Sequence, residues 1–193
     1  MDIKVNKSGG QVNLLSALTM DANNQDLTIE EGTFDLNGFA LTVSGSGGTF
    51  VVESGGNLQL QGGESCSTPT LQAGSSVTYD GTSDASIKDW TYTNADLVIN
   101  GVDGDEVFTL SNTETMVNCT ISSGVLSLNG NGLTASNALT CQADGILRLQ
   151  GGESCTVPVL EDNSTVEYVG AGTYTELNAG DSYYNLTFNG LGS

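Results

Sequence analysis

The sequence of 193 residues contains no histidine, only two prolines, and only four lysine and arginine residues against 23 acidic ones. Without histidine, the chain lacks the usual base for serine or cysteine nucleophiles and the usual nitrogen ligand of structural zinc. A net charge of −19 repels nucleic-acid phosphates and anionic lipid headgroups. There is also no apolar run of about 18 residues. We therefore expect no nucleic-acid partner and no direct membrane insertion.

The few basic residues also argue against catalysis. A polysaccharide lyase needs a base beside a calcium-binding carboxylate cluster, and a glycosidase needs two opposed carboxylates. The basic side chains Lys4, Lys7, Lys88 and Arg148 are scattered along the sequence. We expect no enzyme activity, no catalytic residues and no cofactor.

Glycine is abundant, at 26 residues, and only 37% of residues are hydrophobic. Short segments alternate apolar and polar residues, as at Leu27 and Ile29 and again at Leu58 and Leu60. This period of two predicts strands with one face buried and one in water. Glycine, asparagine, serine and aspartate separate these segments, which favours short strands joined by polar turns over helices.

The sequence also repeats itself. LQLQGGESC at 58–66 returns as LRLQGGESC at 147–155, 89 positions later, with Gln59 replaced by Arg148. Other matched segments set the limits of the repeats: 27–38 resembles 119–130, 2–6 resembles 96–100, and 185–190 resembles 96–101. We interpret 1–193 as one continuous array with a first repeat at 2–95, a second at 96–184 and the first strand of a third at 185–193.

Repeated short strands predict an all-β, right-handed parallel β-solenoid of about 20–24 residues per turn, elongated and about 40 Å long. A solenoid buries only a narrow axial column, which explains the low apolar fraction. The alternative is an antiparallel β-sandwich, since Asn-Gly pairs such as Asn37-Gly38 and Asn129-Gly130 are typical of hairpins. We favour the solenoid because the same short segment recurs without long crossovers.

The segments DLTIEEGTFDLNGFALTVSG (26–45) and YYNLTFNG (183–190) resemble repeats of large bacterial surface proteins of the filamentous-haemagglutinin and autotransporter type. The resemblance implies a right-handed β-solenoid on, or secreted from, a bacterial cell. It implies a structural role as a stalk, adhesin shaft or filament subunit.

Aromatic residues fall late in each repeat: Trp90, Tyr92, Tyr174, Tyr183 and Tyr184. If these rings are exposed, they form a platform on which sugar rings stack, and the chain is then a carbohydrate-binding surface module with glycan partners. The other interpretation is that the rings fill the core or cover a corner of the solenoid.

The loop VDGDEV carries Asp103, Asp105 and Glu106, which offer oxygen ligands to Ca²⁺. The spacing does not match an EF-hand or a calcium-binding nonapeptide, so a solvated turn is the alternative.

Cys119 and Cys141 are 22 residues apart, one predicted turn, and both are expected to face inward. They either form a disulfide between stacked turns or serve as two small apolar residues in the core.

Solenoid ends leave strand edges and apolar faces open. We therefore also expect head-to-tail self-association as a route to filaments.

Overall fold

The computed structural model describes residues 2–174 and 177–190, and these residues form strands and turns with no helix. The strands are β1 (Ile3–Asn13), β2 (Leu18–Met20), β3 (Leu27–Asp35), β4 (Leu41–Val43), β5 (Phe50–Val52), β6 (Gly56–Leu60), β7 (Thr70–Leu71), β8 (Ser75–Tyr79), β9 (Ala85–Ser86), β10 (Ala95–Asn100), β11 (Val107–Thr109), β12 (Glu114–Ser127), β13 (Leu133–Leu149), β14 (Val159–Leu160), β15 (Thr165–Tyr168) and β16 (Asn185–Phe188).

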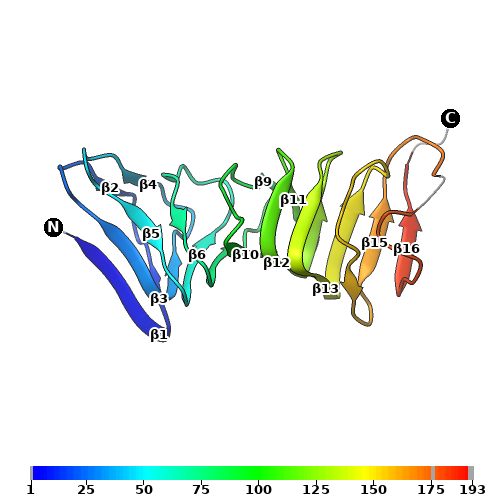
Figure 1. The fold of residues 1–193 in the computed structure, drawn as a ribbon, viewed down its shortest axis with the longest axis horizontal. Helices are drawn as coiled ribbons and strands as arrows, with labels where there is room; N and C mark the ends of the chain where they lie inside the picture. Colours follow the sequence, from blue (N-terminus) through cyan, green and yellow to red (C-terminus); the bar gives the residue numbers. More distant parts are fainter. Residues whose placement is uncertain (1, 175–176, 191–193) are drawn as a thin grey trace.

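The strands stack into an elongated rod with the two termini at opposite ends (Figure 1). Fourteen of them join one sheet, which runs from β16 at one end toward β1 at the other, while β2 and β4 form a separate pair. The pairing is parallel at both ends and at the centre of the rod. The chain is thus an all-β solenoid of about nine turns, which confirms the predicted fold and excludes the antiparallel sandwich.

The length of a turn varies along the rod. Ile3 pairs with Leu27, 24 positions later, whereas Leu58 pairs with Val77 after only 19. The predicted range of about 20–24 residues is therefore nearly right. At about 4.8 Å between hydrogen-bonded strands, nine turns span about 40 Å.

The core is a continuous column of inward-facing side chains. In β6, Gly56, Leu58 and Leu60 are buried while the residues between them are half-exposed. The widest buried side chains are tyrosines and a phenylalanine, including Tyr79 and Phe108, whose ring centroids are 5.8 Å apart. Alternation along each short strand fills this column, so few apolar residues suffice.

Two Asn-Gly pairs, Asn37-Gly38 and Asn129-Gly130, form corners between successive faces. Asn37 and Gly38 both have positive φ, 50° and 79°, and the Phe39 N–H donates to the Leu36 carbonyl at 2.8 Å. Asn129–Gly130 repeats these angles at 52° and 83°. This is the tight turn typical of hairpins, but here it redirects the chain to the next face. These Asn-Gly pairs therefore mark corners of the solenoid and not β-hairpins.

The sequence repeat is longer than a whole number of turns. A column of stacked residues runs through Leu58, Val77, Leu97, Cys119 and Leu139, which is four turns. Leu147, the sequence equivalent of Leu58, comes eight residues after Leu139 and stacks instead between Leu126 and Val166. The second repeat is therefore rotated by one face about the rod axis relative to the first.

Candidate functional site

The predicted aromatic platform is wrong for Trp90 and Tyr92. Trp90 is only 7% exposed and Tyr92 is fully buried, with their rings stacked at 6.4 Å between centroids. The Tyr92 hydroxyl lies 3.2 Å from that of Tyr79 and 3.1 Å from the Lys88 carbonyl. The Tyr92 hydroxyl thus finds its hydrogen-bond partners inside the solenoid. The rings of Trp90 and Tyr92 both fill the core, as the alternative interpretation held.

The other three tyrosines lie in the last turn. Tyr174 and Tyr183 are half-buried against the core. Their hydroxyls donate to the carbonyls of Gly170 and Gly180. Tyr184 is 54% exposed. One exposed ring out of five does not make a flat surface for a sugar.

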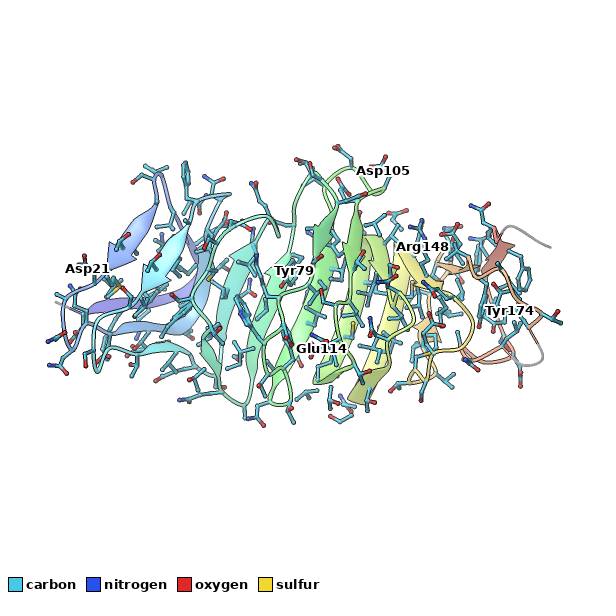
Figure 2. All side chains as sticks on the ribbon, turned by 90° about the horizontal axis from the view of Figure 1, so that it is seen from above. Asp21, Tyr79, Asp105, Glu114, Arg148 and Tyr174 are labelled. Atoms are coloured by element: carbon cyan, nitrogen blue, oxygen red, sulfur yellow. The ribbon has the colours of Figure 1, made fainter. Side chains whose placement is uncertain are left out.

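The acidic loop is organised around its own backbone. Glu106 is buried, and its carboxylate accepts hydrogen bonds from the backbone N–H groups of Asp103 at 2.7 Å and Gly104 at 3.0 Å. Asp105 lies on a loop that projects from the side of the rod (Figure 2). The described residues hold no cluster of three or more metal-ligating side chains. The loop therefore gives no support to the predicted calcium site at Asp103, Asp105 and Glu106.

Two further corners have the same construction, and they explain why the GGESC segment occurs twice. Glu64 accepts the N–H groups of Gln61 and Gly62 at 2.6 and 2.7 Å. Glu153 accepts those of Gln150 and Gly151, both at 2.6 Å. In each case the glutamate receives bonds from residues three and two positions before it, as Glu106 does.

These carboxylates also join neighbouring turns. Glu64 receives a third bond from Gly38 N–H at 3.3 Å, and Glu153 receives one from Gly130 N–H at 3.0 Å. Each glutamate thus closes its own corner and fastens it to the Asn-Gly corner of the preceding turn. The repeated Gly-Gly-Glu segment marks these corners in the sequence, and the sequence analysis assigned it no role.

The one difference between the two copies of the segment also has a structural reason. Arg148 Nε forms an ion pair with Glu167 Oε2 of the next turn at 2.5 Å. Gln59, its counterpart, stacks on Thr78 and donates to Asp80 Oδ2 at 2.5 Å. Thr78 is the equivalent of Glu167 at an offset of 89. The change from glutamine to arginine is therefore matched by a change from threonine to glutamate on the adjacent strand.

The predicted stacking of Cys119 on Cys141 is wrong by two residues. Cys119 pairs with Leu139, and Cys141 pairs with Ile121, so the two cysteines are diagonal neighbours. Diagonal Cα atoms are about 7–8 Å apart, beyond the usual reach of a disulfide. Both thiols are free and buried, which fits the alternative of two small core residues. Burial raises the pKa of Cys119 to about 12 and that of Cys141 to about 11.

Glu114 is a buried carboxyl at the start of β12. It is 7% exposed, and burial together with the negative charge of Asp89 raises its pKa to about 7. Such a shift is common in catalytic acids. In this protein the stacked Trp90 and Tyr92 rings belong to the core, and Figure 2 places Glu114 against the body of the rod. Burial and the charge of Asp89 therefore account for the raised pKa of Glu114, and the shift alone is no evidence of a catalytic role.

A shallow depression of about 480 Å³ lies beside the Asp103 loop. Its walls include Asp103, Ser123, Asp144, Asn163 and Thr165 from successive turns. These side chains offer oxygen and amide groups but no cation. The depression carries no arrangement typical of a catalytic centre.

The two ends of the rod differ from its sides because they present open strand edges. At the C-terminal end, β16 pairs along one edge with β15 and has no described strand on the other. At the N-terminal end, β1 pairs with β3 alone. Large apolar side chains are exposed near both edges, with Leu15 at 85% and Phe188 at 55%.

Comparisons with family models, curated proteins and solved structures found no match. The described residues also contain no helix long and apolar enough to cross a membrane. The resemblance to bacterial surface repeats therefore stays a prediction, and the fold is the firmest guide to function.

Proposed function

We propose that this chain is a rigid shaft segment, a structural β-solenoid that acts as a stalk, adhesin shaft or filament subunit at a bacterial surface or outside the cell. The observation that carries the proposal is the parallel hydrogen-bonded pairing that continues from β1 to β16 around one apolar column. In such a rod every turn is held by the turns above and below it, so bending requires stretching many hydrogen bonds at once.

The small number of basic residues supports a role in a protease-rich environment. All four basic side chains make a polar contact: Lys4 with Glu30, Lys7 with the Gln11 carbonyl, Lys88 with the Glu64 carbonyl and Arg148 with Glu167. With only four lysine and arginine residues in the chain, trypsin has few sites at which to cut.

The alternative of a carbohydrate-binding module is disfavoured, because Trp90 and Tyr92, two of the five rings of its predicted platform, lie in the core.

The experiment that tests the shaft is small-angle X-ray scattering of the chain fused between two globular domains. A rigid shaft of nine turns holds the domains at a narrow distribution of separations, near the rod length of about 40 Å plus the domain radii. A glycine- and serine-rich linker of the same number of residues is the control, because it samples a broad distribution. If the distribution of domain separations is as broad for the shaft fusion as for the linker fusion, the shaft is not rigid and the proposal is refuted.

Resistance to proteolysis is a second and independent readout. We expect the folded chain to survive proteinase K, which does not depend on lysine or arginine, far longer than the urea-unfolded chain. Rapid cutting at many internal corners of the folded chain would contradict a role as an exposed extracellular stalk.

A further inference from the structure

The Asn-Gly pairs are chemically fragile points of the chain. Asparagine is a thermolabile residue, and glycine after it favours deamidation because glycine has no Cβ to keep its backbone nitrogen away from the asparagine side chain. The pair occurs at 37–38, 100–101, 129–130, 131–132 and 189–190. A protein with this composition therefore needs some means of keeping its asparagines intact.

Deamidation begins when the glycine N–H loses its proton and the nitrogen attacks the side-chain carbonyl carbon of the asparagine. A new N–C bond closes a five-membered succinimide ring, and the C–N bond of the side-chain amide breaks to release ammonia. Water then opens the ring at one of its two carbonyls, which gives aspartate or isoaspartate. Isoaspartate carries the main chain through one extra carbon, so it changes the reach of a tight corner.

Two of the pairs are open to water at both residues. Asn37 and Gly38 are exposed, and so are Asn129 and Gly130, whereas each of the other three pairs has at least one residue that is half-buried or buried. Water supplies both the base that removes the glycine proton and the molecule that opens the ring. Burial therefore does not protect Asn37 and Asn129, and their protection has to come from hydrogen bonds.

Corner glutamates hold the glycine nitrogens of these two pairs. Gly38 N–H donates to Glu64 Oε1 at 3.3 Å, and Gly130 N–H donates to Glu153 Oε1 at 3.0 Å. Both glutamates are buried, at 4% and 2% exposed. The negative charge of a carboxylate opposes the loss of a proton from the N–H that faces it. The nitrogen therefore attacks only after this hydrogen bond has broken.

The asparagine side chains are held as well. Asn37 Nδ2 donates to the Leu14 carbonyl at 3.1 Å, and Asn129 Oδ1 accepts from Gln150 Nε2 at 3.2 Å. A backbone hydrogen bond between the residues that flank the pair closes each turn. A side chain held in this way has less freedom to reach the glycine nitrogen.

Neutral acceptors hold the glycine nitrogens of two other pairs. Gly101 N–H donates to the Ser123 carbonyl at 3.0 Å, and Gly132 N–H donates to Thr113 Oγ1 at 3.1 Å. Gly101 is buried and Gly132 is half-buried. The charged acceptor thus lies at the two pairs in which both residues are exposed.

We propose that Glu64 and Glu153 protect Asn37 and Asn129 from deamidation, and that these two asparagines become sites of succinimide-mediated modification when the carboxylate is removed. This goes beyond the shaft function, because a chain with another function would be protected in the same way. It gives the repeated Gly-Gly-Glu segment a chemical role in addition to its structural one.

Peptide mass spectrometry of the 193-residue chain, incubated at mildly alkaline pH, measures the rate at which aspartate and isoaspartate form at each asparagine. The reference is the same chain unfolded in guanidinium chloride. We expect Asn37 and Asn129 to deamidate at least about tenfold more slowly in the folded chain, because a charge-assisted hydrogen bond must break before the nitrogen attacks.

Two variants test the glutamates against each other. Glu153→Ala is expected to accelerate deamidation of Asn129 about tenfold or more and to leave Asn37 within about twofold of its wild-type rate. Glu64→Ala is expected to do the reverse. Each variant thus contains its own control, because general loosening of the rod accelerates both asparagines.

Glu106→Ala is the matched control for the loss of a corner glutamate. Glu106 closes a corner of the same construction, but it accepts from Asp103 and Gly104, which belong to no Asn-Gly pair. We expect this variant to leave the deamidation rates of Asn37 and Asn129 unchanged.

Far-UV circular dichroism checks that each variant is folded. If Glu153→Ala does not fold, Glu153→Gln replaces it, because its neutral oxygen can still accept from Gly130 and the expected acceleration at Asn129 is smaller but still local. Equal rates in the folded and unfolded wild-type chains would overturn the proposal. An unchanged rate at Asn129 in the folded variant, or equal acceleration of Asn37 and Asn129, would also overturn it.

Discussion

Replacing Glu153 by glutamine tests whether the corner glutamates hold the solenoid together. The carboxylate accepts three backbone N–H groups, from Gln150 and Gly130 through Oε1 and from Gly151 through Oε2. The amide of glutamine has one oxygen and one N–H₂ group. It can keep the two bonds at one oxygen, but its N–H₂ then faces the Gly151 N–H, donor against donor.

The loss is one charge-assisted hydrogen bond and the charge on the other two, at a side chain that is 2% exposed. A hydrogen bond to a charged group contributes about 1.5–3 kcal/mol, so we expect Glu153→Gln to lower the free energy of unfolding by about 2 kcal/mol. For a chain of this size that corresponds to a drop in melting temperature of about 4–8 °C.

Urea unfolding followed by far-UV circular dichroism measures the effect, with Glu161→Gln as the control. Glu161 is exposed and its side chain makes no hydrogen bond within the described residues, so the same chemical change there is expected to cost less than about 0.5 kcal/mol. Amide exchange of the Gly151 N–H, which should accelerate in Glu153→Gln, localises the change. Equal stability of the two variants would refute the corner function of the glutamate.

Three other predictions concern buried polar groups. The folded-state pKa of Glu114, about 7, lies above its ordinary value of 4.5. The folded state therefore binds the extra proton, and its stability falls by about 1–3 kcal/mol as pH rises from 4.5 to above 7. Glu114→Gln should remove this part of the pH dependence in urea titrations. Arg148→Gln is expected to cost about 1 kcal/mol by leaving the Glu167 carboxylate without its cation. Adding Glu167→Thr, which restores the pair of the first repeat, should recover most of it, and an additive double variant would contradict the coupling. With the partly buried Cys66 and Cys155 replaced by serine, Cys119 and Cys141 should not react with an aromatic disulfide reagent at pH 8 until the chain unfolds, and reaction of this folded variant at the rate of free cysteine would contradict their burial.

Alternation and repetition predicted the class of fold because both follow from local rules. A strand with one buried face must alternate, and a stack of like turns must repeat, so segments such as 27–29 and 58–60 carry the information in their own residues. The Asn-Gly pairs were harder to interpret. A turn with two positive φ angles fits both a hairpin and a solenoid corner, and only the pairing of the flanking strands decides between them.

The register between turns, that is, which residues stack on one another, could not be predicted from the local sequence pattern. Cys119 and Cys141 were expected to stack because their spacing of 22 equals a typical turn, but that turn has 20 residues at Cys119 and Leu139. A change of two residues in a corner loop keeps the alternation and moves the stacked partner. Trp90 and Tyr92 illustrate a related limit. They lie outside the regular strands, so no periodicity indicated that their rings turn inward.

The rotation between repeats bears on the kind of function that the rod can serve. A binding face on the side of a solenoid needs equivalent side chains on one face, turn after turn. Here the repeat of 89 residues advances by four turns and one further face, so Glu64 and Glu153 occupy different corners. Equivalent residues of successive repeats therefore wind around the axis instead of lining one side. The sides of the rod therefore carry no continuous row of equivalent residues from one repeat to the next, which supports the proposed structural role over a lateral binding face.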